Sequence, residues 1–161
     1  MNYLVGDIGN TLTKICLVRN NLKIYKEYSI ETKKLLFEKN VRKFIFLILK
    51  KNIKKKILFS SVVPNVYRRI KKFINSKNFQ CYEIKNFPLK KIIKINIDNY
   101  NQLGSDRIAN AIGASNLFKS NCLVVDFGTA TTFDIIKKSG IYEGGVIAPG
   151  LKLSILDLNK S

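Results

Sequence analysis

The chain has 161 residues, enough for one ordinary domain or two small ones, and its hydrophobic content of 46% is normal for a globular protein. Its longest apolar run, residues 44–49, is far shorter than the roughly 20 residues of a membrane span, and no leader precedes the first strand pattern. We therefore expect a cytoplasmic protein with no membrane partner.

The formal net charge of +18 comes mainly from lysines scattered among Ile and Asn, a mixture that AT-rich coding favours. The densest basic clusters, residues 50–56 and 68–72, fall at the end of one expected helix and on the polar face of another, where a solvated surface is the simpler interpretation. Nucleic acid is therefore not expected as a partner, although such a surface attracts anionic ligands such as nucleotides.

The first half of the chain predicts a layered α/β unit of three strands, helix, strand, helix and strand. The strands are expected at residues 4–7, 13–18, 22–30, 57–60 and 79–84, with a hairpin turn at Asn20-Asn21. Apolar residues at helical spacing predict a helix over residues 32–50, with Phe37 on its buried stripe, and a second helix opening at Pro64.

The second half repeats the opening pattern after a connection over residues 85–101. A helix is expected from about Ser105, followed by strands at residues 122–126, 131–137 and 141–147 and a last helix at residues 151–158.

A nearly identical phrase ends the first strand of each half. VGDIGNTLTK places Asp7 and Gly9 where VVDFGTATTFD places Asp126 and Gly128. Desolvating a carboxylate at the end of a strand pair costs free energy unless a positive charge compensates it. Mg²⁺ can supply that charge, because it binds carboxylates together with phosphate oxygens. The glycines allow a tight turn whose N–H groups can cradle an anion.

These features predict two phosphate-binding hairpins that hold a metal-bound polyphosphate. Asp7 and Asp126 are the candidate metal ligands. The candidate phosphate-binding residues are Asp7, Gly9, Asn10, Thr11 and Lys14 in the first hairpin and Gly128 and Thr129 in the second. An ordinary turn is the usual meaning of one such match, but recurrence in the same strand–turn–strand context favours the functional interpretation.

A third cluster, Gly104-Ser105-Asp106-Arg107, opens a helix. Asp106 can act there as a helix cap or as a general base for a substrate hydroxyl. Arg107 can grip a substrate carboxylate with two hydrogen bonds, and Tyr100 can line the same pocket. The small residues around Gly144-Gly145 indicate either tight packing or close approach of a ligand.

The chain resembles the type III pantothenate kinases, a family within the superfamily of acetate kinases, sugar kinases and actin. The resemblance rests on DIGNTLTK, SSVVPNV, GSDRIANAIGA, DFGTATTFD and YEGGVIAPGLKLS, which occur in the family's order over essentially the whole chain. It implies a two-lobed ribonuclease H-like α/β fold, with a first lobe over residues 1–95 and an incomplete second lobe over residues 96–161.

The resemblance further implies ATP-dependent phosphorylation of pantothenate, the first step of coenzyme A biosynthesis. Asp7, Asp106 and Asp126 match the family's acidic triad, with Asp106 as the base. The pantothenate pocket corresponds to Tyr100, Gly104, Ser105, Asp106 and Arg107. Mg²⁺, a monovalent cation (K⁺ or NH₄⁺) and a homodimer are implied as well.

Family members are considerably longer, so we expect that strands and helices of the second lobe, much of the adenine site and part of the dimer contact lie outside this chain. The alternative function is a non-catalytic remnant or a regulatory, DNA-associated accessory protein of the same fold.

Overall fold

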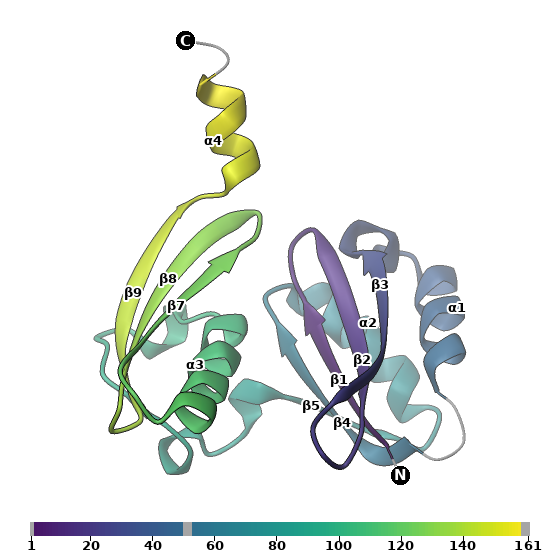
Figure 1. Cartoon of the computed structure of the whole chain (residues 1–161). Coiled ribbons are helices and arrows are strands. Elements are labelled where there is room, and N and C mark those ends of the chain that lie inside the picture. The colour runs from purple at the N-terminus through teal and green to yellow at the C-terminus, as the bar shows by residue number, and fades with distance from the viewer. Residues whose placement is uncertain (1, 50–52, 159–161) are drawn as a thin grey trace. The chain divides into compact units, whose positions relative to one another are not determined.

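The computed structural model describes residues 2–49 and 53–158. It divides into two compact units, residues 1–86 and 87–161 (Figure 1). Each unit has its own sheet, and each is described below by itself.

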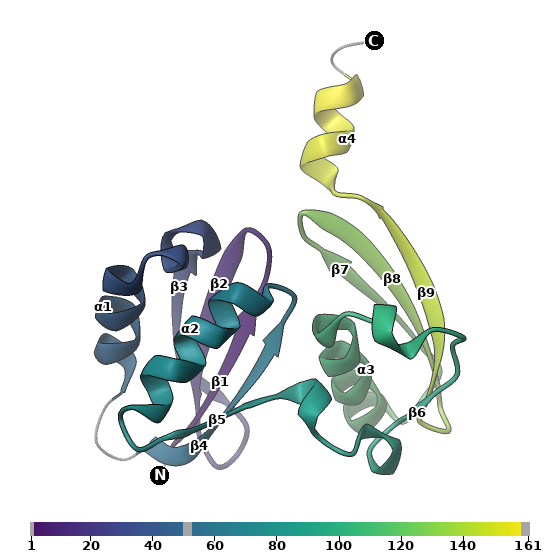
Figure 2. The ribbon, with the colours of Figure 1, turned by 180° about the vertical axis from the view of Figure 1, so that it is seen from behind.

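The first unit is built on a five-stranded sheet of order β3-β2-β1-β4-β5. Its strands are β1 (Asn2–Ile8), β2 (Leu12–Val18), β3 (Ile24–Glu31), β4 (Ile53–Ser61) and β5 (Gln80–Glu83). β1 pairs antiparallel with β2 and parallel with β4, which is itself parallel to β5. Two helices, α1 (Glu38–Ile48) and α2 (Pro64–Asn75), supply the layer that covers this sheet (Figure 2).

The core of the first unit lies between this sheet and its two helices. The sheet contributes alternate residues, such as Leu4 and Ile8 of β1, and the helices contribute residues at helical spacing, such as Ile45 and Ile70. Asp7 is exposed while its neighbour Ile8 is buried, because successive side chains of a strand point to opposite faces. Asp7 therefore lies on the face of the sheet opposite to α1 and α2.

Three expected boundaries in the first unit are wrong. β4 begins at Ile53, four residues earlier than expected, so residues 53–56 of the basic cluster lie in a strand and not at a helix end. The predicted helix over residues 32–50 begins as the 3₁₀ segment Thr32–Leu36, and α1 starts only after Phe37, whose extended backbone (φ −99°, ψ 125°) breaks the helix. Phe37 is 67% exposed and does not belong to the buried stripe; residue 50 lies outside the described residues. β3 starts two residues late because Leu22 adopts φ 62° in the turn.

The second unit has a four-stranded sheet of order β6-β9-β8-β7. Its elements are β6 (Lys94–Ile95), α3 (Ser105–Phe118), β7 (Cys122–Phe127), β8 (Ala130–Lys137), β9 (Ile141–Pro149) and α4 (Leu151–Leu158). The chain also forms short 3₁₀ turns at Ile84–Asn86, Leu89–Lys91 and Tyr100–Gln102. β6 runs parallel to β9, and the other neighbours are antiparallel. α3 contacts β7 and β8 and buries Ile108 and Ala111.

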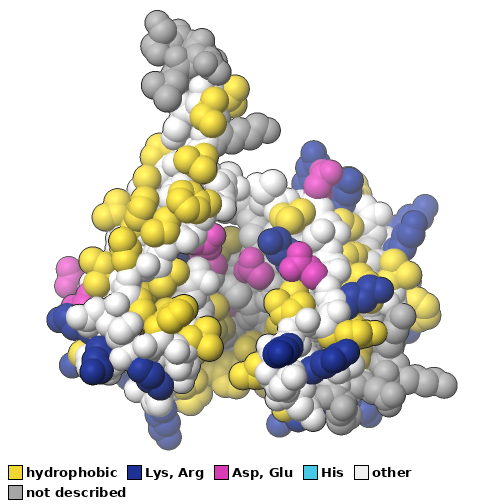
Figure 3. All heavy atoms as spheres, viewed as in Figure 1, with side chains coloured by type: hydrophobic (Ala, Val, Ile, Leu, Met, Phe, Trp, Pro, Cys, Tyr) yellow, Lys and Arg dark blue, Asp and Glu magenta, His cyan; other side chains and the backbone are white. Residues whose placement is uncertain are grey.

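The opposite face of the second sheet is apolar and exposed. Leu123 is paired with Ile135, and Val125 with Phe133, which is paired in turn with Val146, so these side chains share one face. Leu123, Ile135 and Val146 are 63%, 52% and 65% exposed, and Figure 3 shows hydrophobic side chains along these strands and α4. Within residues 2–49 and 53–158, no helix has the length and apolar character needed to cross a membrane.

Candidate active site

The first predicted phosphate hairpin is a closed turn between β1 and β2. The N–H of Gly9 donates to the carbonyl of Leu12 (3.1 Å), and Asp7 is the register partner of Lys14 on the neighbouring strand. Directly opposed residues point to the same face of a sheet, so Asp7 and Lys14 share one face. The predicted donors Asn10, Thr11 and Lys14 are all exposed around this turn.

Thr32 braces this hairpin, and the sequence patterns did not single it out. Its hydroxyl donates to the carbonyl of Gly9 (2.7 Å), and the hydroxyl of Thr13 lies 2.9 Å from it. The N–H of Thr32 donates to the carbonyl of Thr11 (2.9 Å). Both threonines are buried, so the bonds that hold the turn are screened from water.

The second hairpin, between β7 and β8, is one residue shorter than the first. The N–H of Gly128 donates to the carbonyl of Ala130 (3.0 Å), and Asp126 is the register partner of Thr132. In the first hairpin that opposed position is held by Lys14. The sequence repeat aligns Thr132 with Thr13. Because the second turn is shorter, Thr132 instead takes the position that Lys14 has in the first hairpin.

Gly150 packs against the carbonyl oxygens of the second turn. A Cβ built on Gly150 would lie 2.3 Å from the oxygen of Thr129 and 2.6 Å from that of Gly128. Both distances are shorter than real Cβ contacts, so only glycine fits at position 150 beside this turn.

The face of α3 that carries Asp106 contacts Asp126 through Asn110. Asp106 lies in the first turn of α3, and its Oδ1 accepts the N–H of Arg107 (2.8 Å); the N-cap residue, Gly104, makes no side-chain cap. Asn110 follows Asp106 by four residues, so both lie on one face of the helix. Nδ2 of Asn110 donates to Oδ2 of Asp126 (3.2 Å), which turns this face of α3 toward the end of β7.

Arg107 leaves the same turn of α3 and enters the interior of the second unit. Its Nε donates to Oδ1 of Asp134 on β8 (2.8 Å), and its Nη2 lies 2.6 Å from the same oxygen. The hydroxyl of Tyr142 on β9 also donates to this oxygen (2.7 Å). Asp134 is fully buried, whereas the Arg107 side chain remains 12% exposed.

This network shifts two proton equilibria. Burial by itself lowers the pKa of Arg107, but the hydrogen bond and negative charge of Asp134 outweigh it and raise the pKa overall. Burial, followed by the hydrogen bond to Asp134, raises the pKa of Tyr142, so its hydroxyl remains a donor.

Three buried polar atoms in this region have no hydrogen-bond partner among the described residues. They are Oδ2 of Asp134, Oγ1 of Thr132, which is the residue opposite Asp126, and Nη2 of Arg107, whose ion pair with Asp134 is not aligned as a hydrogen bond. A buried polar group without a partner costs about 1–3 kcal/mol. Their concentration on the α3 side of the sheet is typical of a place that receives a polar ligand or water.

The other predicted residues of this cluster lie on the approach to α3. Tyr100 belongs to a 3₁₀ turn and is 37% exposed, whereas Ser105, the first residue of α3, is 2% exposed. Asp7 belongs to the first unit and Asp106 and Asp126 to the second. Among residues 2–49 and 53–158, no three acidic, His or Cys side chains cluster in a way that could hold a metal.

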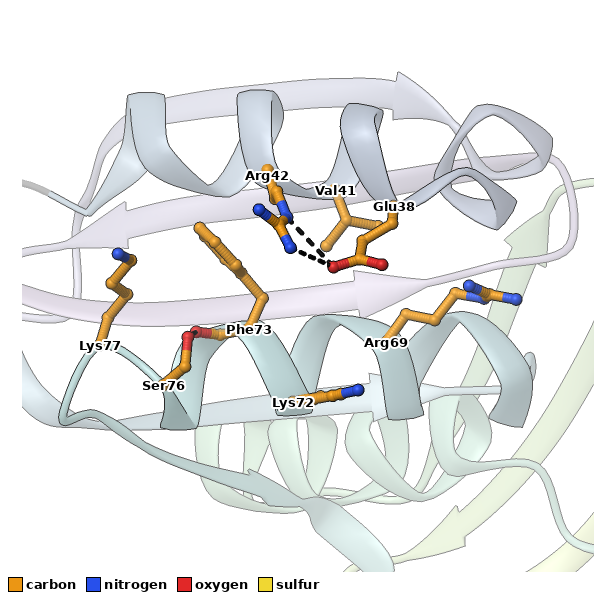
Figure 4. Close-up of a pocket in the computed structure, with 8 residues that line it drawn as sticks. All are labelled: Glu38, Val41, Arg42, Arg69, Lys72, Phe73, Ser76 and Lys77. Carbon is orange, nitrogen blue, oxygen red and sulfur yellow. Dashed lines mark hydrogen bonds and ion pairs between the residues drawn. The ribbon is translucent and has the colours of Figure 1, made fainter.

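A surface hollow of about 300 Å³ lies elsewhere in the first unit, between α1 and α2 (Figure 4). Its basic side chains are Arg42, Arg69, Lys72 and Lys77, and Glu38 is bonded to Arg42 across one rim. Because α1 and α2 cover the face of the sheet opposite to Asp7, this hollow is not part of the phosphate hairpin.

The family model described as type III pantothenate kinase matches residues 3–161. The chain belongs to this family. A type III pantothenate kinase of Pelagibacter ubique (strain HTCC1062) is 48% identical over 153 residues, which cover 94% of this chain and 60% of the relative. A type III pantothenate kinase of Fervidobacterium nodosum is 34% identical over 98% of this chain and 62% of the relative. The chain thus spans about 60% of the length of these curated pantothenate kinases.

Solved structures confirm the expected fold class of this pantothenate kinase family member. The ethanolamine utilization protein EutJ from Carboxydothermus hydrogenoformans matches with a TM-score of 0.57 at 12% identity, over 99% of this chain and 57% of that one. At such identity the likeness shows the fold alone, which is the two-sheet α/β fold of the actin-like ATPases.

Proposed function

We propose that this protein acts in the ATP-dependent phosphorylation of pantothenate to 4'-phosphopantothenate, the first step of coenzyme A biosynthesis. The observation that carries the proposal, beside the family match, is the hydrogen bond from Asn110 to Asp126, made by the helix face that also carries Asp106. It directs the candidate base and a candidate phosphate-side carboxylate toward one region of the second unit.

Asp106 is the proposed general base. Its carboxylate takes the proton of the pantothenate 4'-hydroxyl as that oxygen bonds to the γ-phosphorus of ATP. The bond from this phosphorus to the oxygen bridging to the β-phosphate breaks, and ADP leaves with the bond's electron pair. Phosphoryl transfer needs mostly positioning and charge neutralisation, which the two Asp-x-Gly hairpins and Lys14 are suited to provide.

The hairpins offer hard oxygen ligands that fit Mg²⁺, which usually binds proteins through one or two carboxylates together with substrate phosphates. Asp7 and Asp126 are the proposed ligands, and the unpartnered hydroxyl of Thr132 lies opposite Asp126. Mg²⁺ would neutralise charge on the transferred phosphoryl group. Asn10, Thr11 and Thr129 are proposed to bind phosphate through N–H, amide and hydroxyl groups. Gly9 and Gly128, whose own N–H groups close the turns, are proposed to let the backbone come close to the phosphate.

The substrate-binding residues proposed beside Asp106 are Tyr100, Gly104, Ser105 and Arg107, with Arg107 facing the pantothenate carboxylate. A monovalent cation (K⁺ or NH₄⁺), a homodimer and a cytoplasmic location belong to the same proposal. They rest on the family resemblance.

A coupled assay of ADP release and phosphopantothenate formation tests the proposed base. Asp106→Asn should keep Mg²⁺–ATP binding and lose about 10²–10⁴-fold in turnover, the usual contribution of general-base catalysis. Asp98→Asn is the matched control, because Asp98 is an exposed carboxylate of the same unit outside the proposed site. Wild-type turnover in Asp106→Asn would refute the base assignment.

A titration with Mg²⁺–ATP tests the first hairpin separately. Asp7→Asn should weaken Mg²⁺-dependent ATP binding, and an unchanged affinity would contradict the metal role. If the chain turns over no pantothenate but shifts DNA in a salt-sensitive manner, the accessory-protein alternative is favoured.

A further inference from the structure

The buried carboxylate of Asp134 is the feature of the second unit that the mechanism above does not use. Asp134 is fully buried in the middle of β8, and nothing in the proposed chemistry requires a negative charge there. A buried ion pair is weak support for stability, because desolvating both charges costs about as much as their attraction returns. Its presence beside the candidate site suggests a positioning role.

The geometry points to Asp134 as a positioning residue that aims Arg107 at the carboxylate of the substrate. This inference rests on the proposed pantothenate site. One oxygen of Asp134 accepts from both Nε of Arg107 and the hydroxyl of Tyr142. A long Arg side chain would otherwise sample several rotamers. The bond from Tyr142 holds the carboxylate of Asp134 in place, and this fixed acceptor defines where the guanidinium of Arg107 lies.

The contact with Asp134 occupies the edge of the Arg107 guanidinium formed by Nε and Nη2, and leaves the rest of the group for a ligand. Nε and Nη2 both face Oδ1 of Asp134, at 2.8 Å and 2.6 Å. Nη2 is buried and ion-paired with Asp134, whereas 12% of the Arg107 side chain remains exposed and can meet a ligand. An Arg held by one edge can still present its remaining N–H groups to a carboxylate.

The neighbouring strand is shaped to admit this arrangement. Gly145 is the register partner of Asp134 on β9. A Cβ at Gly145 would lie 2.7 Å from Nη2 of Arg107 and 2.8 Å from Oδ1 of Asp134. The absence of a side chain there therefore makes the space in which Arg107 and Asp134 meet.

Ligand binding by the full chain tests this role without requiring turnover. The probes are pantothenate and its alcohol analogue, pantothenyl alcohol, titrated into wild type, Asp134→Asn and the exposed control Asp98→Asn. We expect wild type and Asp98→Asn to prefer pantothenate by about 10-fold or more, as for a hydrogen bond between charged groups. Asp134→Asn should lose most of that preference while binding Mg²⁺–ATP as wild type does.

An NMR signal separates positioning from general stability. The Nε–H of Arg107 should exchange slowly in wild type because it is bonded to a buried acceptor, and it should exchange faster in Asp134→Asn. If Asp134→Asn does not fold, Tyr142→Phe replaces it, because this change removes only one donor to Oδ1 and should reduce the preference partially.

Each outcome decides the inference. A folded Asp134→Asn protein that keeps the full preference for pantothenate overturns it. Wild type that phosphorylates pantothenate but binds both probes equally also overturns it, and leaves the proposed function standing. If wild type neither binds nor phosphorylates either probe, the proposed function is refuted. The role of Asp134 in aiming Arg107 at a pantothenate carboxylate is then refuted with it.

Discussion

Replacing Gly145 with alanine would fill the space in which Arg107 of α3 reaches β8. The added Cβ would lie 1.9 Å from the carbonyl oxygen of Phe133, on the strand paired with Gly145. Real Cβ atoms essentially never approach closer than 3.0 Å, so β8 or β9 must move by about 1 Å or more. That movement also separates Arg107 from Asp134.

The cost follows from these two effects. Overpacking a tight site costs about 1–3 kcal/mol, and breaking a buried ion pair costs about 3–5 kcal/mol. The two are not additive because one displacement causes both, and we expect Gly145→Ala to lose about 3 kcal/mol of unfolding free energy. For a unit of this size, that corresponds to a melting temperature lower by about 10 °C or more.

Gly113→Ala is the matched control. Gly113 lies inside α3, and a Cβ built there meets nothing within 4 Å. Alanine is preferred over glycine in a helix interior by about 1 kcal/mol, so this variant should be slightly more stable than wild type. The same substitution thus has opposite signs at two glycines of one unit.

Urea unfolding followed by circular dichroism measures both variants, and hydrogen exchange at the amides of β8 and β9 shows whether the loss lies in the second unit. If Gly145→Ala unfolds within about 0.5 kcal/mol of wild type, a difference typical of an ordinary surface change, the close approach described here is wrong.

Three further predictions concern the brace of the first hairpin, a buried thiol and local stability. Thr32→Val removes the donor to Gly9 and should cost about 1–3 kcal/mol in thermal unfolding while weakening ATP binding; unchanged values would show that the turn does not depend on it. Burial raises the pKa of Cys81 to about 11, because the folded state favours the neutral thiol. The contribution of this thiol to the unfolding free energy, at most about 2–3 kcal/mol, should be intact below pH 9 and lost as the pH rises toward 11. An ultraviolet thiolate titration near the ordinary pKa of a free thiol would contradict this shift. Hydrogen exchange over residues 122–158 should be much faster than in the strands of residues 2–84, because the second sheet has an open apolar face and an open edge at β7 among the described residues; uniform protection would contradict this expectation.

Apart from the short β6, which lies in the expected connection, the order of strands and helices was readable from the sequence because it depends on local periodicity. The stripe that contains Ile45 and the one that contains Ile70 are buried as expected. The start of α1 was not readable, since the periodicity continues through Phe37 while its backbone is extended. The segment before it is held by a bond from Thr32 to the Gly9 turn, a contact 23 residues apart in sequence that no local pattern shows.

The candidate site was likewise predictable from the sequence only in part. The Asp-x-Gly repeat located both hairpins, yet not their difference in length, which depends on the pairing of β8 with β7. The ion pair between Arg107 and Asp134 joins residues 27 apart and follows no motif spacing. The one available signal was an acidic residue within an otherwise apolar strand pattern, at Asp134. The proposed roles of Asp7, Asp106 and Asp126 remain predictions.

Asp134 also bears on how β8 finds its alignment during folding. Both faces of the second sheet carry apolar side chains, such as Val124 and Ile136 on one side and Leu123 and Ile135 on the other. Hydrophobic alternation therefore discriminates poorly between registers of this strand. A slip by one residue would move Asp134 to the exposed face of the sheet and leave the largely buried guanidinium of Arg107 without its partner, at a cost of several kcal/mol. The buried pair thus selects a single register, and Asp134→Leu should yield a sheet that still collapses but samples more than one strand alignment.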